Sequence, residues 1–304
     1  MSDTTSRTAA LNNEGFSPES VPDTPLDELG GKQHDTVEPW PEDSVTNDGQ
    51  YSFTDDVAKQ FEEQVLPAQI PGYQLMRQRV LQVGAHFVKA GTTMLDLGTS
   101  QGATIRELIG YLVAKRRDNT TALGTRFLGV DSEEQQLAIG RRKLSDLRQQ
   151  LEQQLGVRVP LDNVELRRHD LVDGLPEMSG YCSLITSVLT IQFVPVEYRQ
   201  ALVASIYNAL APGGALILVE KVQGNSSITD QLLQDIYYSE KSRLGMTDER
   251  IQRKRLSLAG FLVPKRSPEN HYLLQQAGFE EFLVEPFWRD LQFEAVVAVK
   301  RPMP

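Results

Sequence analysis

The fold of this chain is decided by the stretch Met94-Leu95-Asp96-Leu97-Gly98-Thr99-Ser100-Gln101-Gly102-Ala103. A short apolar run ends at an acid, and a loop bounded by two glycines follows. Beyond the loop, apolar residues recur at helical spacing. Strand, tight loop and helix together form the architecture of a nucleotide site, because glycines let a ligand approach the backbone and a helix N-terminus offers unpaired N–H groups. The order of residues in the loop, D-x-G-x-S-x-G, differs from the G-x-G-x-x-G that receives a pyrophosphate. An ordinary strand-to-helix turn is the alternative.

Two further predicted strands lead into an acid. Residues 127–130 are followed by Asp131, and residues 164–168 by His169-Asp170-Leu171. One carboxylate can accept from both hydroxyls of a ribose, which favours Asp131 as a ribose ligand. The alternative is that Asp131 caps the helix expected over 133–155. We interpret His169 as an ordinary histidine at a strand end.

Strands and helices alternate along most of the chain. The patterns predict strands over 93–97, 127–130, 164–168, 181–188 and 215–220, and helices over 54–65, 73–88, 103–116, 133–155, 195–210 and 267–277. Segments 282–287 and 293–299 are typical of an antiparallel hairpin, and Ala211-Pro212-Gly213-Gly214 of a tight turn. The expected fold class is α/β, a doubly wound, mostly parallel sheet closed by this hairpin.

A helical insert at about 222–266 interrupts the alternation. From Lys241 onward it carries a run of bases against only two acids, Asp248 and Glu249: Lys241, Arg243, Arg250, Arg253, Lys254, Arg255, Lys265 and Arg266. A solvated helix face is one interpretation. The other is a lid that recognises an anion, for which the arginine fork suits a carboxylate.

Composition separates the first 50 residues from the rest. They hold 11 acids and two bases, so most of the net charge of −10 belongs to this leader and residues 51–304 are nearly neutral. The leader has too few apolar residues to fold, and we expect residues 1–50 to be disordered, with Trp40 available to dock. Residues 51–304 are expected to form one domain.

Several classes of protein are disfavoured by what the sequence lacks. No apolar run is long enough to span a membrane, and residues 1–20 lack the pattern of a signal peptide. The single cysteine, Cys182, excludes an internal disulfide, and no zinc spacing, P-loop or nucleophile elbow occurs. The nearly neutral body is not typical of a nucleic-acid binder. A cytoplasmic protein without a metal site is expected.

The chain resembles the carboxy-S-adenosylmethionine synthase family, which has the class I methyltransferase (Rossmann-like) fold. The resemblance covers about residues 51–299. It rests on segments 53–58, 71–73, 96–102, 190–193, 199–202, 212–216, 220–221 and 252–255. It implies S-adenosylmethionine (SAM) or carboxy-SAM as cofactor, and a homodimer. In SAM sites an acid at Asp170 accepts from the adenine amino group, and the next residue packs on the ring. In the family, the arginine at Arg255 grips the added carboxylate. The cofactor-binding residues so implied are Tyr73, Asp96, Gly98, Thr99, Ser100, Gly102, Asp131, Asp170, Leu171, Val188 and Arg255.

Three positions depart from the family pattern and favour a changed acceptor. Val188 replaces an asparagine, Tyr237-Tyr238 a histidine pair, and Met246 a tyrosine. The sequence therefore predicts a SAM-dependent methyltransferase acting on a small, anionic acceptor. The first alternative is carboxy-SAM synthesis from SAM and prephenate, which serves tRNA wobble-uridine modification. The second alternative is a non-catalytic SAM-binding module. Candidates for catalytic groups, among which the sequence does not choose, are Tyr73, Gln192, Glu220 and Arg255.

Overall fold

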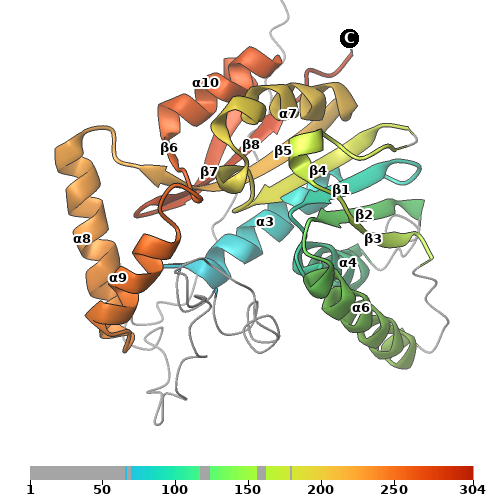
Figure 1. The fold of residues 1–304 in the computed structure, drawn as a ribbon. Helices are drawn as coiled ribbons and strands as arrows, with labels where there is room; N and C mark the ends of the chain where they lie inside the picture. Colours follow the sequence, from blue (N-terminus) through green and yellow to red (C-terminus); the bar gives the residue numbers. More distant parts are fainter. Residues whose placement is uncertain (1–65, 67–69, 117–123, 156–161, 179, 304) are drawn as a thin grey trace, which may run out of the picture. The chain divides into compact units, whose positions relative to one another are not determined.

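A mixed sheet with five parallel strands at one side forms the centre of the fold (Figure 1). The computed structural model describes residue 66 and residues 70–116, 124–155, 162–178 and 180–303, all within the unit Trp40–Pro304. The acidic leader with Trp40 and the helix expected over 54–65 lie outside the described residues.

The elements follow one another as the alternating pattern predicts. The strands are β1 (Thr93–Leu97), β2 (Arg126–Asp131), β3 (Val164–Arg168), β4 (Cys182–Val188), β5 (Leu210–Gln223), β6 (Lys265–Arg266), β7 (Val284–Asp290) and β8 (Phe293–Val299). The α-helices are α3 (Tyr73–Phe87), α4 (Ala103–Arg116), α6 (Glu134–Leu155), α7 (Val196–Ala209), α8 (Ser227–Arg243), α9 (Asp248–Ser257) and α10 (Ser267–Ala277). Short 3₁₀ turns, η3 (Leu171–Asp173), η4 (Ile191–Phe193) and η5 (Glu281–Leu283), follow β3, β4 and α10.

The strand order is β3-β2-β1-β4-β5-β8-β7. Neighbours from β3 to β5 pair in parallel, whereas β8 pairs antiparallel with both β5 and β7. This is the doubly wound, mostly parallel sheet closed by a C-terminal hairpin that the sequence predicts. Because the five parallel strands run the same way, their carboxyl ends meet at one edge, where open α/β sheets bind ligands.

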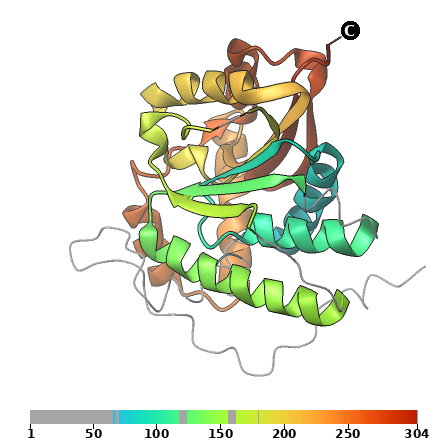
Figure 2. The same cartoon turned by 90° about the vertical axis from the view of Figure 1, so that its right-hand side faces the viewer.

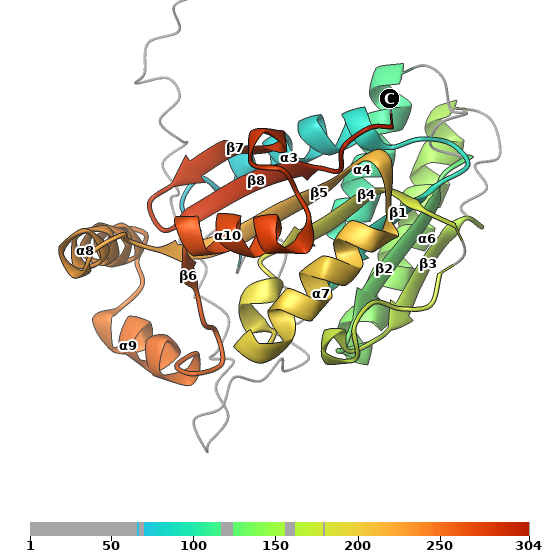
Figure 3. The same cartoon turned by 90° about the horizontal axis from the view of Figure 1, so that it is seen from above.

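Helices cover both faces of the sheet and enclose two cores (Figures 2 and 3). On one face, α3, α4 and α6 pack on residues such as Met94 and Phe127. On the other, α7 and α10 pack on residues such as Leu95 and Leu216. Alternate residues of one strand thus enter different cores, which explains why strands such as Thr93–Leu97 are buried throughout.

Strand β5 is longer than the expected segment 215–220. The Ala211-Pro212-Gly213-Gly214 turn stays within the strand, because Gly213 N donates to Lys300 O and Lys300 N donates to Gly214 O. Three extra residues in β5 appear as a register shift against β4, because Cys182 and Leu184, two residues apart, pair with Leu210 and Ala215, five residues apart. The tight turn is therefore accommodated as an irregularity in a continuous strand.

The insert forms two helices, α8 and α9, which lie beyond the carboxyl end of β5 (Figures 1 and 3). Ser226 caps α8 by accepting from Thr229 N, and Thr247 caps α9. Both ends of the insert are tied to the sheet. At its start Gln292 Nε2, between β7 and β8, donates to Asp230 Oδ1 of α8 (3.2 Å), and at its end β6 pairs with β5 while Val263 N donates to Gln192 O (3.0 Å).

Candidate active site

The loop after β1 is shaped by residues with positive φ. Gly98, Ser100 and Gly102 have φ values of 64°, 52° and 76°. A Cβ at Gly98 would collide with the side chain of Thr190, whose hydroxyl donates to Leu97 O (3.0 Å). The glycine that sequence reasoning assigned to ligand approach therefore also lets the loop after β4 approach β1.

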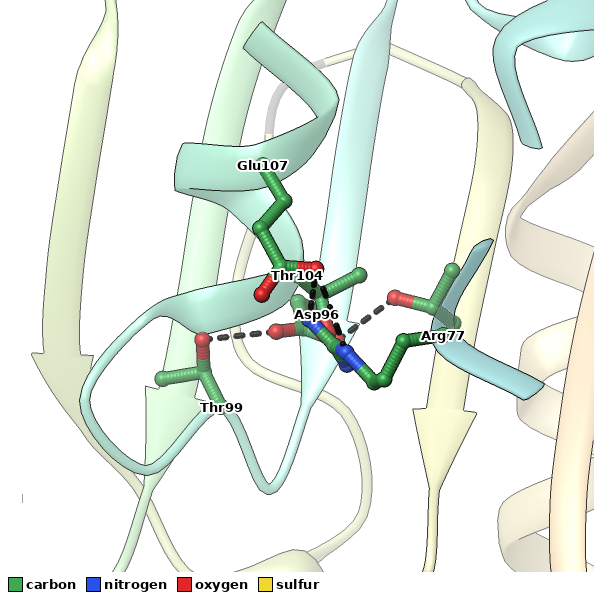
Figure 4. Close-up of polar contacts among 6 residues, drawn as sticks. Arg77, Asp96, Thr99, Thr104 and Glu107 are labelled. Atoms are coloured by element: carbon green, nitrogen blue, oxygen red, sulfur yellow. Dashed lines mark hydrogen bonds and ion pairs between the residues drawn. The ribbon is translucent and has the colours of Figure 1, made fainter. Parts of the chain in front are cut away.

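Asp96 lies beneath this loop as part of a buried polar network (Figure 4). Its carboxylate accepts from Thr99 Oγ1 (2.7 Å) and Thr186 Oγ1 (2.6 Å), and the residue is 2 % exposed. Burial raises the pKa of Asp96 to about 6, although the two hydroxyls and the Arg77 guanidinium lower it. Of the implied cofactor ligands, Asp96 and Thr99 thus bind each other and fix the loop.

Arg77 is a buried residue of this region that sequence reasoning missed. From α3 it donates to Glu107 Oε2 (2.8 Å) and Thr104 Oγ1 (2.9 Å) on α4 (Figure 4). It also interacts electrostatically with Tyr73 and Asp96. Tyr73 begins α3 and is itself buried. Arg77 thereby links the start of α3 to the helix after the loop. The sequence signal that could have revealed Arg77 is its position four residues after Tyr73, which places both on one face of the helix.

Asp131 stands at the carboxyl end of β2, beside the glycine loop. Its Oδ2 accepts from Ser100 N (2.8 Å), and its Oδ1 accepts from Glu133 N (2.9 Å), just before α6 begins. Burial raises the pKa of Asp131. The backbone N–H of Ser132 also contributes, so three donors engage the four lone pairs of the carboxylate and leave capacity for one more. Asp131 therefore makes the contact with Glu133 N that was expected of a helix cap, and this contact does not exclude a role in binding a ribose.

Asp170 and Leu171 follow β3 at the same edge. Asp170 is exposed, and its Oδ1 accepts from Val172 N (3.0 Å), whereas Leu171 packs in the core on the α7 side. His169 Nε2 lies 2.9 Å from Gly174 O, in keeping with the ordinary role expected for it.

The edge continues at β4 and β5, where Val188, Gln192 and Glu220 lie. Val188 ends β4 and is partly buried. Gln192 Oε1 accepts from Lys221 N (2.8 Å), and Glu220 Oε1 accepts from Ile191 N (3.1 Å). Burial raises the pKa of Glu220 to about 8, against the opposing charge of Arg199. The structure brings both catalytic candidates together and engages both with backbone N–H groups.

Most bases of the lid for which a contact is known form surface ion pairs. Arg243 pairs with Glu240, Arg253 with Glu249, and both Lys265 and Arg266 with Glu269. For these residues the solvated-face interpretation is sufficient. Exposed Arg255 differs, because none of the described carboxylates lies within 4.0 Å of its guanidinium. Arg255 instead acts electrostatically on Tyr238 and Lys221.

Two lysines, the partly buried Lys221 and the buried Lys241, lie over one aromatic ring near Arg255. Lys221 Nζ, from the end of β5, lies 4.8 Å from the ring centroid of Tyr237, and Lys241 Nζ, from α8, lies 4.3 Å from it. Burial lowers the pKa of Lys221 to about 8, and nearby Arg255 contributes. Burial, Lys254 and Lys221 lower the pKa of Lys241 to about 7. Sequence reasoning missed this pair, although Tyr237 and Lys241 stand at i,i+4 on one helix face.

The described residues contain no group of three or more His, Cys, Asp or Glu side chains that could hold a metal ion. Within the same part of the chain, every helix is too short or too polar to cross a membrane.

The comparisons with known sequences point to one family. The chain is 34 % identical over 253 residues to a carboxy-S-adenosyl-L-methionine synthase from Methylococcus capsulatus, covering 82 % of this chain and 93 % of that protein. It is 28 % identical to the synthase of the same name from Staphylococcus epidermidis, covering 84 % and 99 %. No family model matches the chain.

Solved structures share the fold at low identity. An O-methyltransferase family protein from Burkholderia thailandensis superposes with a TM-score of 0.51 at 15 % identity over 75 % of this chain, which spans 56 % of that protein. A complex of DhpI with SAH superposes with a TM-score of 0.51 at 17 % identity, covering 84 % of this chain and 97 % of that one.

Proposed function

The chain belongs to the carboxy-S-adenosyl-L-methionine synthase family, and from this premise we propose that it transfers the methyl carbon of SAM to a small anionic acceptor. That it is a SAM-dependent transferase follows from the family and the fold. The identity of the acceptor and the residues that bind SAM are our proposals. SAM supplies a methyl group already activated by its sulfonium, so the protein has chiefly to align the acceptor.

The donor set at the sheet edge fits SAM. Asp131 has acceptor capacity left for a ribose hydroxyl, and exposed Asp170 can accept from the adenine amino group, whereas the buried Leu171 supports this turn from the core on the α7 side. The loop Gly98–Gly102 follows β1, as a ligand-binding loop of this fold does. Tyr73 and Val188 complete the proposed SAM site, and Asp96 and Thr99 support its loop.

The main support for an anionic acceptor is the position of Arg255. This residue is exposed on α9 beside Lys221 and Tyr238, with no described carboxylate in ion-pair distance, while neighbouring lid bases are paired. A planar guanidinium can hold a carboxylate by two parallel hydrogen bonds. We assign Gln192 and Glu220 to positioning the loop after β4, since both engage backbone N–H groups there.

Carboxy-SAM synthesis is the second candidate. Family membership favours it, and by the resemblance of segment 252–255 Arg255 matches the arginine that binds the added carboxylate in the family. The three departures at Val188, Tyr237-Tyr238 and Met246 favour a different second substrate.

One experiment separates the candidates. The purified protein is incubated with SAM and, in parallel, with prephenate or a panel of small carboxylic acids, and the products are identified by mass spectrometry. A methylated acid with S-adenosylhomocysteine supports methyl transfer, whereas SAM heavier by one carboxylate supports the synthase reaction. No binding of SAM in calorimetry would overturn both.

The SAM site is tested separately by Asp131→Ala. We expect SAM affinity to fall by roughly 10-fold or more, as for a lost hydrogen bond to a charged group. Asp173→Ala, at an exposed acid of the neighbouring 3₁₀ turn, is the control and should bind SAM normally. Undiminished affinity in Asp131→Ala would remove the ribose assignment.

A further inference from the structure

We propose that Lys221 and Lys241, arranged around the ring of Tyr237, bind a carboxylate of the second substrate. The proposal rests on the proposed function and adds the residues that recognise the anion. Arg255 belongs to the exposed side of the same region, whereas the two lysines lie deeper.

The two ammonium groups lie over the same aromatic ring, and Lys221 acts electrostatically on Lys241. Lys221 Nζ and Lys241 Nζ lie 4.8 and 4.3 Å from the same ring centroid, so they are separated by no more than the sum of these distances. Lys241 is 7 % exposed and Tyr237 is 5 % exposed. The ring packs in turn against Tyr238 and Phe293, at centroid distances of 5.4 and 5.8 Å.

The charges around this pair are almost all positive. Arg255 on α9 lowers the pKa of Lys221, and both Lys254 and Lys221 lower the pKa of Lys241. No carboxylate of the described residues lies within 4.0 Å of Lys241 Nζ or Lys221 Nζ. Asp230, the acid that acts on Lys221, already accepts from Gly224 N, Gln234 Nε2 and Gln292 Nε2.

Burying positive charge without a counter-ion is costly, and lysines perturbed in this way cluster at functional sites. Two ammonium groups beside aromatic rings suit an organic anion, because the rings offer apolar contact while the amines bind the carboxylate. SAM brings a sulfonium cation as well as its one carboxylate, so an acceptor that is anionic throughout suits this pair better. The occupant we assign is therefore the acceptor.

The backbone places the pair at the right edge of the sheet. Lys221 follows Glu220 near the carboxyl end of β5, and its N–H donates to Gln192 Oε1 in the loop after β4. This is the edge that carries the glycine loop and the acids proposed for SAM. A carboxylate held by Lys221 and Lys241 would thus lie on the lid side of that edge.

The test measures carboxylate binding and SAM binding separately. Calorimetry of the full-length protein saturated with S-adenosylhomocysteine uses prephenate and phenylpyruvate as probes, in wild type, Lys221→Met, Lys241→Met and Lys241→Arg. Arg253→Met, at an exposed base paired with Glu249, is the matched control. SAM is titrated into each variant without a carboxylate, and thermal unfolding verifies that each is folded.

We expect the dissociation constant of the better-binding carboxylate to rise roughly 10- to 100-fold in both methionine variants. Lys241→Arg, which keeps the charge, should retain most of the affinity, and Arg253→Met should match wild type. SAM affinity should stay within about twofold throughout.

Three results would overturn the inference. Unchanged carboxylate affinity in both methionine variants removes the site. An equal loss of SAM affinity assigns the lysines to the carboxylate of SAM itself. No detectable binding of any probe to a wild type that binds SAM excludes a small carboxylate as the acceptor. A wild type that fails to bind SAM refutes the proposed function instead.

Discussion

Replacing Lys241 with methionine should make the folded protein more stable at neutral and mildly acidic pH, although it removes a charge proposed to serve binding. The side chain is buried, and the pKa of its ammonium group falls from 10.5 to about 7. At about 1.4 kcal/mol per pKa unit, this corresponds to a cost of roughly 4–5 kcal/mol when the folded protein must keep the charge. Methionine fills a similar volume without it. Loss of the cation–π contact with Tyr237 offsets about 1–2 kcal/mol. The expected net gain is about 2–4 kcal/mol.

The sign of the pH dependence follows from proton binding. Between pH 7 and 10.5 the unfolded chain holds a proton on Lys241 that the folded chain releases, so wild-type stability rises with pH across this window. The methionine variant lacks this term. Its advantage should be full below pH 7, shrink as pH rises, and be nearly gone at pH 10.5.

Urea unfolding followed by circular dichroism at pH 6, 8 and 10 measures the effect. Arg253→Met serves as control and should change the free energy of unfolding by less than about 0.5 kcal/mol, because its ion pair with Glu249 is exposed. The reasoning is refuted if Lys241→Met is less stable than wild type at pH 6, or if its gain does not depend on pH.

Three further outcomes are expected. Gly98→Ala should lower the free energy of unfolding, measured in urea, by about 2–5 kcal/mol, because the residue has a positive φ and its new Cβ would collide with Thr190. Gly110→Ala, at a helical position with open space, should raise it by up to about 1 kcal/mol. Equal effects of the two changes would contradict the geometry. Arg255→Ala should weaken binding of the preferred carboxylate roughly 10-fold in calorimetry while SAM binding stays intact; a uniform loss would argue against an acceptor role. Burial raises the pKa of Cys182 to about 12, so iodoacetamide at pH 8 should label it only after denaturation, as mass spectrometry would reveal.

Local patterns predicted most of the fold. Strands 93–97 and 164–168 and helices 103–116 and 267–277 have the expected bounds, because apolar periodicity and flanking glycines act within a few residues. Strand β5 exceeded its expected length because Lys300, directly after β8, continues the antiparallel backbone bonds to Gly213 and Gly214. That partner comes from the end of the chain, which no local window includes.

The site was predictable where one residue marks a strand end, and not where distant residues converge. Asp131 and Asp170 could be placed at the ligand edge from the strands that precede them. Tyr237 and Lys241 lie on α8, whereas Lys221 lies in β5. They meet only because α8 packs back against Phe293, which places the ring of Tyr237 beside Lys221. Similarly, the backbone contacts of Glu220 depend on how the loop after β4 folds over β5.

The fastening of both ends of the insert has a consequence for how such proteins diversify. Arg199, buried on α7, donates to Val263 O and Gln192 O, and at the opposite end Gln292, between β7 and β8, donates to Asp230 Oδ1. The segment between these two attachments contributes little to the parallel sheet, so residues of its helices can be substituted while the fold is retained. Natural variation in what the protein accepts should therefore concentrate between Gly224 and Val263, leaving the SAM half unaltered.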